Sequence, residues 1–130
     1  MEKIVRIEEV TFNTNKSYEH YDGYQIITEN QTIKLGIYNS QCCCEHWGYF
    51  MSEDNLDDFI GADFIKLEIT DTCLNTKKLD KEDLNYPNTM FVNIYTTKGM
   101  LQFVAYNSHN GYYGHDAVII SNELNHNERL

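Results

Sequence analysis

The chain has 130 residues, of which 20 are acidic and 10 basic, so its formal net charge at pH 7 is -10. Binding of DNA or RNA through phosphates needs a concentration of basic side chains, and this composition excludes it. No apolar run approaches the roughly 18 residues needed to span a membrane, and the first residues lack the apolar core of a secretory signal. We therefore expect one soluble domain over residues 1–130, in the cytoplasm of a bacterial host cell.

The first half of the chain predicts a hairpin after an ambiguous start. Residues 4–10 are apolar enough to be ordered, but strand alternation and helical spacing describe them equally well. Residues 24–29 and 32–38 predict two antiparallel strands that turn at Asn30-Gln31. In the second of these strands three apolar residues share one face: Ile33, Leu35 and Ile37.

The middle of the chain predicts a helix, a strand and a polar stretch. Ser52 can cap a short helix that has acidic residues in its first turn and ends at Gly61. Residues 76–86 are polar, and a helical turn over 81–84 is expected there. Residues 64–70 alternate as a strand does, with three apolar side chains expected to point inward: Ile65, Leu67 and Ile69.

The last part of the chain predicts the clearest hairpin. Residues 90–96 and 100–106 form its arms, and they turn at residues 97–99, where Gly99 supplies a positive φ. Residues 117–121 add a further strand. The total is about six antiparallel strands with one or two short helices, so we predict an α+β fold.

Three of the four cysteines gather in one segment, residues 41–50, which we expect to be a loop. Cys42, Cys43 and Cys44 are consecutive and precede His46 and Trp47, while Cys73 stands alone. Neighbouring Cα atoms lie about 3.8 Å apart, closer than the roughly 5 to 6 Å that a disulfide prefers, so the chain is expected to be reduced. Structural zinc sites use spaced cysteine pairs, so we favour packing by the thiols over a metal site and expect no cofactor. A cysteine nucleophile beside His46 is the remaining alternative.

A second segment, residues 106–116, also has an unusual composition for a connection. It holds three tyrosines, two histidines and two asparagines, together with the turn signal Asn110-Gly111. Either its polar groups cap their own backbone, or it is a recognition loop whose tyrosines stack on a ligand and whose glycines leave main-chain N–H groups free. The candidate ligand-binding residues of the two segments are Trp47, Tyr49, Tyr106, Asn107, His109, Asn110, Tyr112, Tyr113 and His115.

These strings also carry a resemblance. Cys-Cys-Glu-x-Trp-Gly-Tyr at 43–49, Phe-Ile-Gly at 59–61 and the tyrosine-rich string at 106–115 resemble a small uncharacterised-domain family common in phages and prophages of Gram-positive bacteria. That group in turn resembles the Thoeris anti-defence sponges, which sequester cyclic ADP-ribose-type signals between protomers without cleaving them. The resemblance implies a homo-oligomer and a nucleotide-derived ligand. One departure is that only Arg6 and Arg129 are present to meet phosphates, so lysines such as Lys98 and main-chain N–H groups would have to contribute.

Three functions compete at this stage. The sequence contains no nucleotide-binding glycine loop and no hydrolase or metalloprotease motif, which favours a binding protein over an enzyme. The leading hypothesis is a phage-type counter-defence protein that sequesters a cyclic nucleotide-derived signal. The alternative is an acidic protein inhibitor, of nucleic-acid-mimic or anti-CRISPR type, that docks on a basic host defence protein. A small hydrolase or transferase using His109 or His115 is the third. A homo-oligomer is also expected from the many tyrosines and the few protected strand edges.

Overall fold

The computed structural model describes residues 2–14, 19–40, 46–82, 87–108 and 114–130. These residues form a single sheet of nine strands in the order β4-β7-β6-β5-β1-β2-β3-β8-β9, and every pairing is antiparallel. The strands are β1 (Glu2–Asn13), β2 (His20–Thr28), β3 (Thr32–Tyr38), β4 (His46–Met51), β5 (Asp63–Thr70), β6 (Asn88–Thr96), β7 (Gly99–Ser108), β8 (Asp116–Ile120) and β9 (His126–Arg129).

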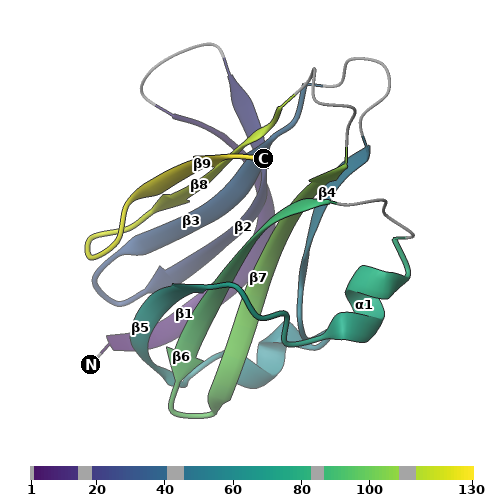
Figure 1. The fold of residues 1–130 in the computed structure, drawn as a ribbon. Coiled ribbons are helices and arrows are strands. Elements are labelled where there is room, and N and C mark those ends of the chain that lie inside the picture. Colours follow the sequence, from purple (N-terminus) through teal and green to yellow (C-terminus); the bar gives the residue numbers. More distant parts are fainter. Residues whose placement is uncertain (1, 15–18, 41–45, 83–86, 109–113) are drawn as a thin grey trace.

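The sheet folds over into two layers because β1 takes part in both of them. Glu2 and Lys3 of β1 pair with β5, whereas the rest of the strand pairs with β2. Figure 1 shows β2, β3, β8 and β9 in one layer and β4, β5, β6 and β7 in the other. The core lies between the layers and is built from fully buried aliphatic and aromatic side chains, among them Ile26, Ile33, Leu35, Ile37, Val92, Ile94, Leu101 and Phe103.

The α+β prediction is wrong, because the described residues are almost entirely antiparallel strand. They contain only a four-residue 3-10 helix, η1 (Leu56–Phe59), and a five-residue helix, α1 (Thr76–Asp80). Ser52 caps no helix. Its N–H donates to the Gln102 carbonyl (2.8 Å) and its hydroxyl accepts from the Gln102 N–H (2.9 Å), so it prolongs the ladder between β4 and β7. α1 also begins earlier than the turn expected at 81–84, of which residues 83 and 84 lie outside the described residues.

The two predicted hairpins are confirmed in outline. β2 and β3 pair across the turn at residues 29–31, where the Thr28 N–H donates to the Gln31 carbonyl (2.9 Å). β6 and β7 pair up to Thr96 and Gly99, so their connection is the two residues Thr97 and Lys98, one fewer than expected. Gly99 has φ +121°, a backbone conformation that residues other than glycine rarely adopt.

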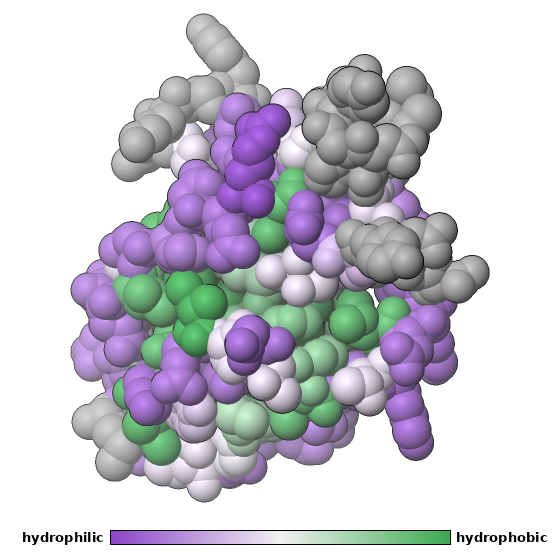
Figure 2. Space-filling view, in the orientation of Figure 1, coloured by the Kyte–Doolittle hydropathy of each residue, from purple (hydrophilic) through white to green (hydrophobic). Residues whose placement is uncertain are grey.

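The inward direction predicted for Ile65 of β5 is wrong, and Ile69, which pairs with the buried Val92, is only partly covered. Leu67 is buried as expected, but Ile65 is 48% exposed and Ile69 37%. The register of β5 on β6 shifts between Phe64 and Lys66, and that of β1 on β2 shifts between Ile4 and Arg6. Such bulges break the alternation of faces, so Ile65 turns outward at the corner of the sheet. In the view of Figure 2, apolar surface reaches the solvent among polar side chains.

A buried polar network fixes the long connection that leads from β5 to its neighbour β6. Gln102 of β7 is 1% exposed, and its Nε2 donates to the Thr72 carbonyl (2.9 Å) and to Asn93 Oδ1 (2.8 Å). Its Oε1 accepts from the Leu74 N–H (2.8 Å). Because two of these bonds reach the β5–β6 connection and the third reaches β6, the connection and α1 are held against this layer, beside the end of β4. No helix in the described ranges is long and apolar enough to cross a membrane.

Candidate functional site

The candidate site lies at the end of the sandwich where β4 starts and β8 begins. The segment 41–50 was expected to be a loop, but residues 46–50 belong to β4, which pairs with β7 in a regular register from His46 to Met51. Gly48 permits this close pairing, because a Cβ there would lie 2.3 Å from Tyr106 Oη. β4 therefore places Trp47 and Tyr49 on a rigid strand at one edge of the described sheet.

Trp47 stacks on His115, and both residues were predicted for the site. Their ring centroids lie 5.3 Å apart with an interplanar angle of 26°. His115 is 1% exposed, and its Nδ1 is 2.6 Å from the Tyr38 carbonyl oxygen. A carbonyl can only accept, so Nδ1 carries the proton and donates it to Tyr38. The backbone of His115 is also fixed, by reciprocal hydrogen bonds with Leu130 of 3.0 and 2.9 Å.

The indole N–H of Trp47 is a buried donor that has no hydrogen-bond partner among the described residues. The side chain as a whole is partly exposed. Leaving such a donor unpaired typically costs about 1 to 3 kcal/mol, so nearly all buried donors in proteins are paired. Trp47 thus combines partial exposure with a buried donor that lacks an acceptor among the described residues.

Tyr49 joins the site to an acidic neighbourhood. Its ring meets Tyr24 edge to face at 5.8 Å, and its hydroxyl donates to Glu9 of β1. Burial and this hydrogen bond raise the pKa of Tyr49 far above its ordinary value, so the phenol stays neutral. Burial, Glu9 and Asp54 raise the pKa of Tyr24 in the same direction.

Tyr106 and Asn107 were expected in a recognition loop, but both belong to strand β7 and are buried. Tyr106 is 5% exposed, and burial together with a hydrogen bond to Glu82 raises its pKa. Asn107 is fully buried, and its Nδ2 donates to the Leu130 carbonyl (3.2 Å). Both side chains support the end of the sheet, and ligand contact stays a prediction for them.

Four of the predicted residues cannot be placed: His109, Asn110, Tyr112 and Tyr113 lie outside the described residues, as do Cys42, Cys43 and Cys44. Cys73 is partly buried, and burial raises the pKa of its thiol, which disfavours the reactive thiolate. Among the residues that the structure describes, no three His, Cys, Asp or Glu side chains come close enough to hold a metal ion.

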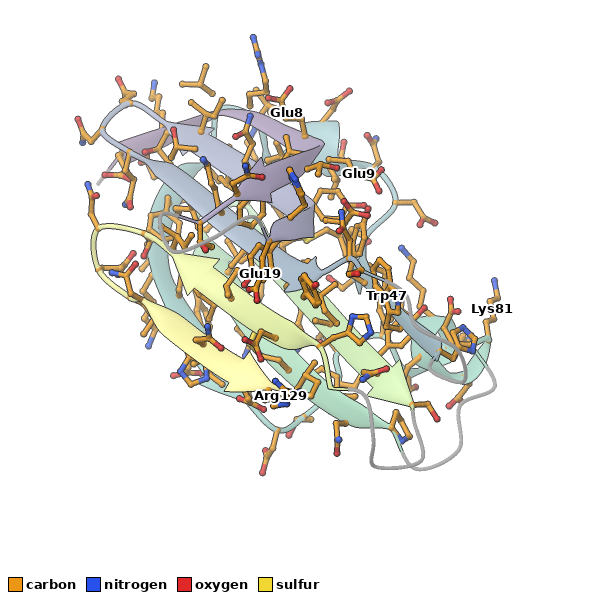
Figure 3. The ribbon with its side chains drawn as sticks, turned by 90° about the horizontal axis from the view of Figure 1, so that it is seen from above. Glu8, Glu9, Glu19, Trp47, Lys81 and Arg129 are labelled. Carbon is orange, nitrogen blue, oxygen red and sulfur yellow. The ribbon has the colours of Figure 1, made fainter. Side chains whose placement is uncertain are left out.

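Arg129 is a residue at this end that sequence reasoning did not assign. Arg129 lies on β9, a strand whose sequence shows no apolar periodicity, and its side chain is 71% exposed. Its Nη1 lies 3.8 Å from Asp116 Oδ1, and its stem passes over Gly114, where a Cβ would lie 2.6 Å from Arg129 Nε. Figure 3 looks down on this end and shows Trp47 in projection between Arg129 and Lys81.

The arrangement brings an aromatic ring with a buried, unpaired donor and an exposed cation to the same end of the described sheet, and comparison with known proteins adds a family. The model of a domain of unknown function, DUF7448, matches residues 1–119. The chain belongs to this family. No curated protein and no solved structure matches it. The resemblance to an uncharacterised-domain family is thus confirmed and extends to the N-terminal strands, while nothing in the match connects DUF7448 with phages or with Thoeris sponges.

Proposed function

We propose that this DUF7448 protein is a non-catalytic binder that sequesters a nucleotide-derived signal of the cyclic ADP-ribose class, as a phage counter-defence protein would. The observation that carries the proposal is Trp47, which is partly exposed and has a buried indole N–H without a partner among the described residues. A nucleobase offers both a planar face and ring acceptors. Stacking of a base on an aromatic side chain is worth about 1 to 3 kcal/mol.

Arg129 supports an anionic ligand at the same end. Asp116 holds it only loosely, at 3.8 Å, and most of the guanidinium faces solvent. A guanidinium can donate two parallel hydrogen bonds to a phosphate, which makes it the preferred side chain for this group. The two arginines of the chain are thus not equivalent: Arg129 lies at the proposed site, whereas Arg6 lies on β1, 3.8 Å from Glu8.

The surroundings of His115 support binding rather than catalysis. Its Nδ1 is committed to the Tyr38 carbonyl, and its ring lies against the rings of Trp47 and Tyr38, at centroid distances of 5.3 and 5.8 Å. A general acid or base must reach the reacting atom of the substrate, and a ring that is 1% exposed and packed in this way is poorly placed to do so. His115 is better suited to hold Trp47 in position.

The test is calorimetric titration of the protein with cyclic ADP-ribose, and with ADP-ribose for comparison. Trp47→Phe keeps an aromatic face but removes the N–H, and Arg129→Gln removes the cation. Each should weaken binding by about tenfold or more, which corresponds to about 1.4 kcal/mol. Lys66→Gln, on β5 away from the site, is the matched loss of one positive charge and should leave the affinity unchanged.

Mass spectrometry of the bound ligand, released by heating, separates a binder from an enzyme. Recovery of the intact nucleotide supports sequestration, whereas recovery of a cleaved product shows that the protein is an enzyme. Absence of binding to both nucleotides, or equal affinities of wild type and both site variants, would remove the nucleotide proposal.

A further inference from the structure

Within the part of the chain that the structure describes, β4 has no partner strand on one of its two sides. The Ser52 N–H donates to the Gln102 carbonyl, in the register that continues along β4 and β7. Main-chain groups of alternate residues point to opposite sides of an antiparallel strand, so those of His46, Gly48 and Phe50 face β7. The N–H and C=O groups of Trp47 and Tyr49 therefore point away from β7. No strand of the described sheet lies beyond β4.

The next carbonyl of β4 that points away from β7, that of Met51, is paired with a lysine. The Met51 carbonyl accepts from Lys78 Nζ (2.7 Å), which is also paired with Asp54 Oδ1 (2.6 Å). A lysine from α1 thus ends the free edge on the Met51 side. Toward the start of β4 the four groups of Trp47 and Tyr49 remain, about 7 Å apart along the strand. Unpaired donors and acceptors in this pattern are a template for one more strand.

Three carboxylates border the edge, together with Lys78 and Lys81. Glu9 is hydrogen-bonded to the Tyr49 hydroxyl, and Asp54 lies beside the Met51 end through Lys78. Glu82 lies 3.8 Å from His46 Nε2 at the start of β4. With a net charge of -10 on the whole chain, the field at this edge favours a strand that carries positive charge.

We infer that the β4 edge, defined by the main-chain groups of Trp47 and Tyr49, is a docking site for an extended, basic segment of a partner protein. The segment adds to β4 as a further strand, with its lysine or arginine side chains toward Glu9 and Asp54. A second copy of this chain is the less favoured occupant, because pairing two β4 edges would bring two sets of the same carboxylates together. This inference goes beyond the proposed nucleotide binding and does not depend on it.

The decisive measurement is hydrogen exchange of individual amides by NMR. Trp47 and Tyr49 should exchange fast in the protein alone, whereas Gly48 and Phe50, whose N–H groups face β7, are internal controls that should be protected. The probe is a ten-residue peptide of alternating Lys and Val, and its acidic counterpart of alternating Glu and Val is the control. The basic peptide should slow exchange at Trp47 and Tyr49 by about tenfold or more and leave Gly48 unchanged.

A matched pair of variants tests the role of charge. Glu9 and Glu68 each accept a hydrogen bond from a tyrosine hydroxyl, but only Glu9 borders the β4 edge. Glu9→Gln should lower the affinity for the basic peptide by about two- to fivefold, as expected for the loss of one exposed charge pair. Glu68→Gln should leave this affinity unchanged.

Three results would overturn the inference. The first is no added protection of Trp47 and Tyr49 by the basic peptide. The second is equal protection by the acidic peptide, which would remove charge selection. The third is protection of both amides in the protein alone that is lost on dilution, which would assign the edge to a second copy of the chain.

Discussion

Replacing Gln102 by alanine should destabilise the protein far more than an ordinary glutamine substitution does. The side chain makes three hydrogen bonds, to the Thr72 carbonyl, to Asn93 Oδ1 and from the Leu74 N–H. At about 1 kcal/mol for each hydrogen bond, their loss amounts to about 3 kcal/mol. Thr72 and Leu74 are exposed, so water can replace the bond at each of them, whereas Asn93 is 8% exposed and is left with a buried acceptor. We therefore expect a loss of 2 to 4 kcal/mol in the free energy of unfolding, with about 1 to 3 kcal/mol of it from a stranded acceptor such as Asn93 Oδ1.

Urea denaturation at fixed pH measures this loss, and Gln25→Ala is the matched control. The Gln25 amide donates to Glu8 alone, which is partly exposed, so its removal should cost less than about 1 kcal/mol. Hydrogen exchange is a second measurement, because a β5–β6 connection released from Gln102 should exchange faster in α1 while β2 and β3 stay protected. If the free energy of unfolding of Gln102→Ala lay within about 0.5 kcal/mol of the wild-type value, the network would not be what holds this connection.

Four further predictions concern the core, the pH dependence, metal and assembly. Leu67→Ala should cost about 2 to 5 kcal/mol in urea denaturation, and Ile65→Ala, in the exposed bulge, less than about 1 kcal/mol; equal losses would contradict the observed faces of β5. Hydrogen bonds from Thr28, Gln31 and Asn30 lower the pKa of Glu2 in the folded protein. The stabilisation that Glu2 adds to the folded state is therefore fully present above its unfolded-state pKa, and it is lost as pH falls through the lower folded-state pKa. Glu2→Gln should therefore narrow the difference in melting temperature between pH 7 and pH 3, and an unchanged difference would show that Glu2 contributes nothing. EDTA should leave the melting curve unchanged, and stoichiometric metal release with loss of cooperative melting would contradict this. Light scattering should show a homo-oligomer at micromolar concentration, and a monomer would rule out a pocket shared between protomers.

The sequence predicts those parts of the fold whose signals are local. The hairpins at residues 24–38 and 90–106 follow from apolar alternation on either side of a turn, and both form. The helix expected after Ser52 shortens to the 3-10 helix η1 (Leu56–Phe59). Ser52 does not cap it, because its hydrogen-bonding groups are taken by Gln102, a partner 50 positions away that no local pattern reveals. β9 has no signal of its own, since its residues are polar and become a strand only by pairing with β8.

The candidate site divides in the same way. Residue type alone selected Trp47 and His115, and the structure places their rings against each other. Composition could not show that Tyr106 and Asn107 are buried in β7, because a tyrosine or asparagine suits a recognition surface and a sheet interior equally well. Arg129 was missed because only the pairing of β8 with β9 brings it beside Gly114.

The pairing of β3 with β8 has a consequence for how the protein is made. Tyr38 and His115, which meet at the end of this pair, are 77 positions apart. At a synthesis rate of about 5 to 20 residues per second, β3 leaves the ribosome roughly 4 to 15 s before the strand that covers its edge. During that interval the β3 edge that β8 will cover has no partner strand, and such unpaired edges favour aggregation. The Trp47–His115 stack forms only when this wait ends, so a nascent chain acquires its candidate binding site as one of its final steps.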